Sequence, residues 1–221
     1  MSQLTRKDCQ TKILDAAEAA FADGGYSGAS MRDIVRVAGV NLATVYYHFG
    51  SKNGLMEAVL KRRLGPLRLE HLEILREFER EAKGAPLTVE KILEAMLLPP
   101  LRLVKAPLAK RQAVTRLIGR IVTEPDAQTQ AILRTQRSEV RAAFLQALRS
   151  SLPKISAADL QWRMEFVWGA LAFILCNPRT IQLQTRGACN PVDAAKVLSE
   201  MIGFFAAGFR APAVHMRAAT A

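Results

Sequence analysis

Side chains able to bind a phosphate backbone or the edge of a base are concentrated between residues 30 and 53, in the stretch SMRDIVRVAGVNLATVYYHFGSKN. Hydroxyl and imidazole groups donate hydrogen bonds to phosphate oxygens and bases, and an ammonium group adds a full positive charge. A small residue among them lets the backbone approach a groove. The candidate DNA contacts that the residue types themselves indicate are Ala43, Thr44, Tyr46, Tyr47 and Lys52.

The same stretch contains the signals for two short helices and a turn between them. Ser30 can cap the first helix, with Asp33 in the place that Glu has in a capping box. Gly39 can adopt the left-handed conformation that ends a helix, and Asn41 can cap a second helix that begins near Leu42. The buried face of the first helix is expected to hold Ile34, Val37 and Ala38.

The second helix has an apolar side and a polar, aromatic side. Val45 and Phe49 lie on the apolar side. The outward side holds Ala43, Thr44 and Tyr47, with Tyr46 at its flank. Gly50 ends this helix and Ser51 caps the next one, so Lys52 lies at a helix N-terminus, where backbone N–H groups already favour a phosphate. An apolar back and a polar front are what a recognition helix needs.

Helix-turn-helix geometry also occurs in proteins that do not bind DNA, and a helical hairpin in an ordinary core is the alternative. A capped helix, a turn, an amphipathic helix and a capped lysine follow in order, which favours DNA binding. From about Thr11 to about Leu60, the chain resembles the TetR family of bacterial transcriptional regulators. The resemblance rests on F-x-x-x-G-Y, a capped D-I helix, A-G-V, T-[VL]-Y-x-[HY]-F and S-K-x-x-L.

The resemblance implies which residues contact the operator. In such regulators the positions that match Ser30, Thr44, Tyr46, Tyr47, His48 and Lys52 contact DNA, mostly at phosphates. The chain departs from the family pattern at Val35, where Ala is usual, at Leu42, where polar residues are common, and at Gly54, where Glu is usual. Gly54 is expected to weaken the first turn of its helix by about 1 kcal/mol relative to Ala.

The rest of the chain shows helical spacing broken by Pro and Gly, without period-2 alternation, and predicts an all-α fold. We expect an N-terminal three-helix helix-turn-helix DNA-binding domain at 1–55. A larger helical ligand-binding and dimerisation domain (about nine helices) is expected at 56–210, and a tail at 211–221. The expected helical segments are 7–23, 51–83 with a kink at Gly65-Pro66, 88–105 with an interruption at Pro99-Pro100, 109–123, 126–151, 156–176, and a last helix that starts at Asn190-Pro191.

The last two helices are apolar on two sides. In segment 156–176, one stripe holds Trp162, Phe166, Gly169 and Phe173, and the other holds Met164, Val167, Leu171 and Leu175. A helix that is apolar nearly all round must be buried on both sides, which favours a homodimer over a monomer with a thick core. The resemblance adds that the family dimerises through a four-helix bundle of the last two helices. The expected interface residues are Phe173, Leu198, Ile202, Phe205 and Phe209, although the stripe that faces the partner is left open.

A basic excess lies beside apolar residues in the middle of the chain. The segment 102–149 holds ten basic and three acidic residues. In the family a ligand enters an apolar cavity and changes the spacing of the two DNA-binding domains. A cation at the rim of such a cavity would suit a fatty acid or an acyl thioester. The stretch 116–144 and the helix that holds Trp162 and Phe173 also resemble the ligand domain of fatty-acid-responsive members of the family. The candidate ligand contacts are Arg116, Leu117, Arg120, Ile121, Trp162 and Phe166. Arg134, Arg137 and Arg141 are expected to form a solvated face, and the one buried-looking acid, Glu165, to pair with a neighbouring Arg.

The charge and the scattered histidines limit the other function classes. The net charge of +11 suits a polyanionic partner, but residues 1–65 contribute only +3 of it. A sequence-independent DNA-packaging protein is the alternative, although it would not explain a large helical ligand domain. His48, His71 and His215 are scattered and no H-E-x-x-H or G-x-S-x-G is present, so neither catalysis nor a metal or other cofactor is expected.

Three cysteines, Cys9, Cys176 and Cys189, lack C-x-x-C spacing, and no signal peptide precedes the first helix. We expect a cytoplasmic, nucleoid-associated protein with reduced thiols and no membrane contact. The expected partners are an imperfectly palindromic double-stranded DNA operator, a second copy of the chain and a small-molecule effector.

Overall fold

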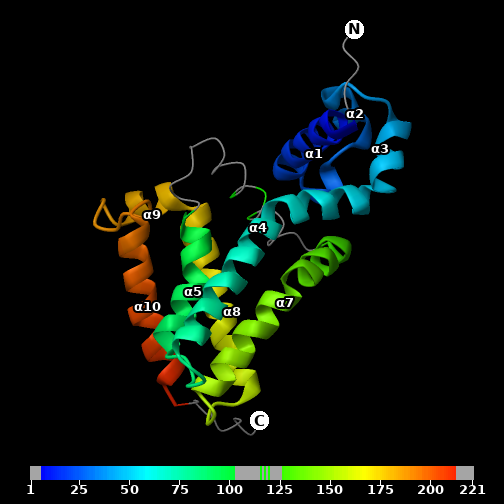
Figure 1. Ribbon diagram of the computed structural model, residues 1–221. Helices are drawn as coiled ribbons and strands as arrows, with labels where there is room; N and C mark the ends of the chain where they lie inside the picture. The colour runs from blue at the N-terminus through cyan, green and yellow to red at the C-terminus, as the bar shows by residue number, and fades with distance from the viewer. Residues whose placement is uncertain (1–5, 103–114, 116, 118, 120–125, 213–221) are drawn as a thin grey trace, which may run out of the picture. The chain divides into compact units, whose positions relative to one another are not determined.

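The regular structure is entirely α-helical within residues 6–102, 115, 117, 119 and 126–212, which are the residues that the computed structural model describes (Figure 1). The class predicted from the sequence is therefore confirmed. None of the described helices is long and apolar enough to cross a membrane. The helices are α1 (Arg6–Gly28), α2 (Met31–Ala38), α3 (Leu42–Phe49), α4 (Lys52–Glu81), α5 (Val89–Arg102), α7 (Ala127–Ser151), α8 (Ala157–Cys176), α9 (Pro178–Gln184) and α10 (Ala194–Arg210).

The chain forms two compact units, each with its own core. The first comprises the described residues within 1–69 and 106–139, and the second those within 70–105 and 140–221. Both α4 and α7 contribute residues to the two units. The domains predicted from the sequence, 1–55, 56–210 and a tail at 211–221, are defined by function and not by these compact units. That division stays a prediction.

The core of the first unit forms where α1, α2, α3 and the start of α4 meet. Ile13, Ala17 and Phe21 of α1, which share one face of the helix, are fully buried. Gly25 has a φ of 67°, which breaks the helical geometry near the end of α1. The prediction for Val37 is wrong, because its side chain is 65% exposed. The short helix α2 buries Ile34 and Ala38 four residues apart, and Val37 lies beyond the edge of that face.

In the second unit, helix α5 continues through both prolines to Arg102, so the interruption predicted there is wrong. A proline inside a helix has no N–H to give to the carbonyl four residues earlier, and for Pro100 that carbonyl belongs to Met96. The buried imidazole of His71, from α4, donates its Nε2–H to the Met96 carbonyl at 3.0 Å. This hydrogen bond gives the Met96 carbonyl the donor that Pro100 cannot supply.

The predictions for the middle of the chain have mixed outcomes. The predicted segment 51–83 contains one helix, α4, with Pro66 inside it. Helix α7 begins one residue after the predicted start and buries Val140, Phe144 and Leu148. Glu165 pairs with Arg141 as predicted, but it lies at the surface and not in the core. The predicted helix 109–123 lies outside the described residues except at isolated positions.

The two apolar stripes of α8 have different environments. Met164, Val167 and Leu171 are buried in the core of the second unit. The other stripe is exposed, and we call it the aromatic stripe: Trp162, Phe166, Gly169 and Phe173. On α10, Phe204 is 76% exposed, whereas Phe209 is buried in the core of its own chain. Phe209 therefore has no surface to offer a partner, contrary to its predicted place in the interface. Leu198, Ile202 and Phe205 are half-buried against the same core.

Candidate nucleic-acid interface

Helices α2 and α3 and the turn between them are capped as the sequence predicts. The Ser30 hydroxyl accepts a hydrogen bond from the Asp33 N–H at 3.4 Å. Gly39 ends α2 in the left-handed conformation, with a φ of 67°. The Asn41 side chain accepts hydrogen bonds from both the N–H and the hydroxyl of Thr44, each at 2.7 Å. These caps fix the start of α3 relative to α2.

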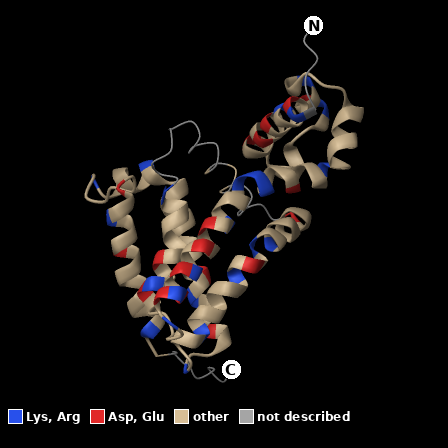
Figure 2. Ribbon diagram, viewed as in Figure 1, with Lys and Arg blue, Asp and Glu red and all other residues tan. Residues whose placement is uncertain are grey.

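The outward face of α3 is the predicted one. Val45 is buried and Phe49 packs partly against the core, whereas Ala43 and Tyr46 are exposed and Tyr47 is 73% exposed. No Lys, Arg, Asp or Glu lies on α3 (Figure 2). Hydroxyl groups, rings and backbone are therefore what this helix offers a groove, and positive charge must come from neighbouring elements. We call the candidate contacts Ser30, Ala43, Thr44, Tyr46, Tyr47, His48 and Lys52 the DNA-binding face.

The imidazole of His48 contacts a residue that the sequence did not point to. The Gln10 side chain, from α1, lies 3.3 Å from His48 Nδ1. With the Gln10 amide as donor, Nδ1 accepts and the proton of the neutral ring lies on Nε2. His48 can then donate that N–H to a phosphate oxygen. A glutamine 38 positions away gives no pattern signal, because only the packing of α1 against α3 brings it near.

Lys52 lies at the first position of α4 and faces an aromatic ring. Its ammonium nitrogen lies 4.7 Å from the centroid of the Tyr26 ring, a cation–π distance. The Tyr26 hydroxyl donates to the Asn53 side chain, and the Asn53 amide donates to Gln128 of α7 at 3.0 Å. Burial, together with the negative charge of Asp126, raises the pKa of Tyr26. Lys52 is thus held in a polar cluster that includes the first turn of α7.

Gly54 has a different role from the one expected. The Ser51 hydroxyl accepts a hydrogen bond from the Gly54 N–H at 3.1 Å, which caps α4. A Cβ atom at position 54 would lie 2.0 Å from the carbonyl oxygen of Phe49. A side chain cannot be placed there unless the backbone shifts. Gly54 therefore permits a close approach between the end of α3 and the start of α4.

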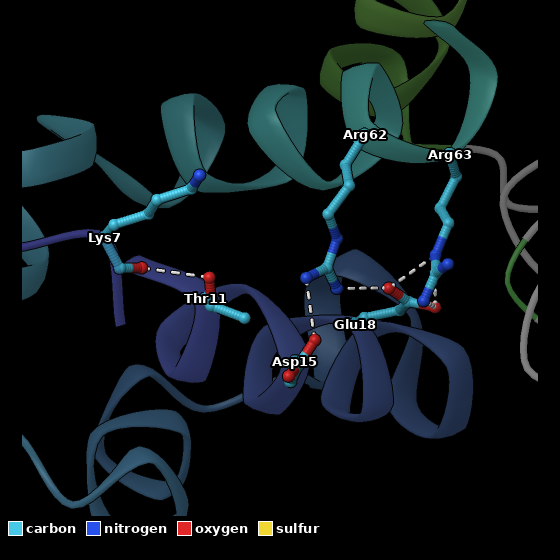
Figure 3. A network of polar contacts seen from close by, with 6 residues as sticks. All are labelled: Lys7, Thr11, Asp15, Glu18, Arg62 and Arg63. Atoms are coloured by element: carbon cyan, nitrogen blue, oxygen red, sulfur yellow. Dashed lines mark hydrogen bonds and ion pairs between the residues drawn. The ribbon is translucent and has the colours of Figure 1, made fainter. Parts of the chain in front are cut away.

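An ion-pair network joins α1 to α4 within the first unit (Figure 3). The Glu18 side chain is 5% exposed and pairs with Arg62 at 2.5 Å and with Arg63 at 2.6 Å. Arg62 also pairs with the exposed Asp15 at 2.7 Å. A buried carboxylate needs such partners, because an unpaired buried charge is strongly destabilising. The network therefore fixes the first part of α4 against the helix that supports the DNA-binding face.

The candidate ligand contacts lie in two different units or outside the described residues. Leu117 is buried in the core of the first unit, whereas Trp162 and Phe166 belong to the exposed aromatic stripe of the second. Arg116, Arg120 and Ile121 lie outside the described residues. The ligand contacts therefore stay a prediction from the sequence.

Two capped helices at a glycine turn, with an apolar back and a polar outward face, define the class of helix-turn-helix DNA-binding proteins. Comparison with protein families agrees with this class. Residues 13–59 match the model described as bacterial regulatory proteins, tetR family, and residues 94–208 match the tetracyclin repressor-like C-terminal domain. The second match covers more than half of the chain. The chain therefore belongs to the TetR family of transcriptional regulators.

Relatives and solved structures agree with this assignment. A 105-residue segment, 48% of the chain, is 31% identical to the HTH-type transcriptional regulator SrpR of Pseudomonas putida, of which it covers 44%. A 105-residue match to the uncharacterized HTH-type transcriptional regulator TtgW of the same species has the same identity and covers 69% of TtgW. The chain thus spans less than half the length of SrpR. The fold is similar to that of the fatty acid degradation regulator FadR from Bacillus halodurans, with a TM-score of 0.57, 16% identity, and coverage of 92% of this chain and 97% of FadR.

Proposed function

We propose that the protein is a dimeric repressor that binds an imperfectly palindromic operator through its DNA-binding face and is released by an amphipathic anion. The observation that favours operator binding most is the outward face of α3, where Tyr47 is 73% exposed on a helix capped at both ends. Ser30, His48 and Lys52 border this face and contact phosphates. Ala43, Thr44, Tyr46 and Tyr47 approach the groove.

Dimerisation is supported by the exposed apolar surface of the last two long helices. Among the described residues, Phe204 and the aromatic stripe expose large rings at the surface. Exposed apolar area of this kind marks an interaction site. A symmetric dimer buries the same surface of both copies and presents two DNA-binding faces to two half-sites.

The effector class rests on the sequence. The basic excess of segment 102–149 beside apolar residues suits an anionic headgroup on an apolar chain. The similar fold of a fatty acid degradation regulator is compatible with this class but does not determine it. Release requires a ligand that binds more tightly to the conformation in which the spacing of the two DNA-binding faces does not match the two half-sites. A typical coupling free energy of about 1–3 kcal/mol lowers operator affinity roughly 5- to 150-fold.

The decisive experiment is footprinting on genomic fragments followed by titration of the complex. We expect protection of a palindrome with half-sites about 34 Å, or a multiple, apart. Binding without a preferred site would instead favour a DNA-packaging protein. Long-chain fatty acids, their coenzyme A thioesters and uncharged hydrophobic drugs should then be added to the operator complex. Release by the uncharged drugs alone would contradict the anionic effector and leave the operator assignment intact.

A further inference from the structure

The first turn of α7 contacts Asn53, the residue next to Lys52, although the two segments are far apart in the sequence. The Asn53 amide donates to Gln128, 75 positions later, at 3.0 Å. Asp126, directly before α7, accepts a hydrogen bond from the Thr129 N–H at 2.7 Å and so caps the helix. All of these residues belong to the first unit.

Asp126 stands two residues before Gln128, whose side chain accepts the hydrogen bond from Asn53. Its charge acts on both members of the Lys52–Tyr26 pair. The hydrogen bonds from Thr129, and further the positive charge of Lys52, hold the pKa of Asp126 below its usual range. The carboxylate of Asp126 in turn raises the pKa of Tyr26, in addition to the effect of burial. Asp126 therefore remains ionised at neutral pH, with a negative charge near the ammonium group of Lys52.

A lysine ammonium group that interacts with a carboxylate of its own chain interacts less strongly with a DNA phosphate, because the two anions compete for one positive charge. DNA binding draws its sequence-independent affinity from such lysine–phosphate contacts. A carboxylate beside the lysine lowers the local positive potential and repels the phosphate at the same time. On this basis, we propose that the first turn of α7 restrains DNA binding, because Asp126 competes with the operator phosphate for Lys52. The proposal rests on the proposed role of Lys52 as a phosphate contact.

The restraint has a structural consequence for regulation. Helix α7 starts beside Asn53 in the first unit and ends in the second, where Phe144 and Leu148 are buried in the core. The Asn53–Gln128 hydrogen bond keeps the first turn of α7 in place against α4. A change in the position of this turn therefore alters the strength of the interaction between Lys52 and a DNA phosphate.

The test is a double-mutant cycle in the full-length chain, with operator and non-operator duplexes as probes and fluorescence anisotropy as the readout. Asp126→Asn removes the charge but keeps the cap, because Asn and Asp are equally good at the N-cap. We expect this variant to bind both duplexes more tightly, by roughly 2- to 5-fold per subunit at low salt, the size typical of an exposed ion pair. The gain should shrink as salt rises.

Two further variants make the result specific. Asp193→Asn is the matched control, because Asp193 caps α10 through the Lys196 N–H at 3.1 Å and its loss changes the net charge by the same amount. It should leave affinity unchanged. In a Lys52→Ala background, Asp126→Asn should have no effect. Equal or weaker binding by Asp126→Asn, or an equal gain without Lys52, would overturn the proposal. If Lys52→Ala itself did not weaken binding, the proposed phosphate contact would fail instead.

Discussion

Helices α3 and α8 both expose aromatic rings, but the polar groups around those rings differ. The exposed rings of α3 are tyrosines next to His48 and Lys52, and their hydroxyls can donate hydrogen bonds. The aromatic stripe of α8 holds Phe166, Phe173 and Trp162 around Gly169, and Phe204 is exposed on α10. Phenylalanine rings gain by leaving water and offer no hydrogen bond. Both surfaces are thus candidates for an interaction by their exposure, and the polar atoms of α3 distinguish the one that we propose binds DNA.

The largest effect should come from a charge on the apolar surface. Phe204→Glu is expected to raise the dimer dissociation constant by at least about 100-fold, since burial of one phenylalanine contributes about 1.5–3 kcal/mol and a symmetric dimer contains two. Sedimentation velocity measures the outcome. Phe204 is 76% exposed in the single chain, so the fold should persist. Tyr47→Glu is the matched control and should abolish DNA binding while the dimer remains. A dimeric Phe204→Glu protein would remove α10 from the proposed interface.

The second prediction concerns the support of the DNA-binding face. Glu18→Gln should lower the free energy of unfolding by about 3 kcal/mol, because the charges of Arg62 and Arg63 lose their buried partner. Asp15→Asn removes a carboxylate from the same Arg62 at an exposed position and should lower it by only about 0–1 kcal/mol. Urea denaturation compares the two variants. Equal losses would show that burial at Glu18 adds nothing to the network.

Gly54 gives the third prediction, which has the opposite sign to helix propensity. Gly54→Ala should destabilise the protein by about 1–3 kcal/mol, because the new Cβ would overlap the Phe49 carbonyl. Gly203→Ala, in the middle of α10 with nothing near its Cβ position, should instead stabilise it by up to about 1 kcal/mol. Thermal melts of both variants measure the difference. A stabilising Gly54→Ala would mean that α3 and α4 do not approach so closely.

The smallest expected effect tests the tyrosine hydroxyl directly. Tyr47→Phe keeps the ring but removes the donor, and operator affinity should fall roughly 2- to 10-fold per subunit, equivalent to one hydrogen bond of about 0.5–1.5 kcal/mol. Phe173→Tyr makes the reverse change on the aromatic stripe and should leave operator affinity unchanged at protein concentrations that keep the dimer intact. Anisotropy titrations compare the two. If both variants bound as the wild type does, the hydroxyl groups would not distinguish the two surfaces.

Local signals were sufficient to predict the helix-turn-helix. The caps at Ser30 and Asn41, the left-handed Gly39 and the outward position of Tyr47 depend on residues within four positions of one another, and the structure has them as predicted. Val37 is an exception because α2 has only eight residues. In so short a helix the partner helices, and not the period alone, determine where the buried face ends.

Contacts between distant segments could not be predicted in this way. Gln10 beside His48, Gln128 beside Asn53 and Asp126 near Lys52 have no periodic or motif signal, because side chains that meet across helices are brought together only by packing. The continuation of α5 through its prolines is a similar case. His71 donates to the Met96 carbonyl from another helix, so a rule that considers one helix by itself predicts a break.

Short-range periodicity and the residues that cap or end helices were enough to predict the all-α class, the capped helix-turn-helix and the two apolar sides of α8. Packing against neighbouring helices then determined which of those sides is buried and which is exposed, and which charges meet. It placed Met164 and Val167 in the core and left Phe166 and Phe173 at the surface. Gly54 is required at its position because the Phe49 carbonyl oxygen approaches it closely, which helix propensity does not indicate. Such outcomes depend on the shape and charge of neighbouring helices, which a linear pattern does not contain.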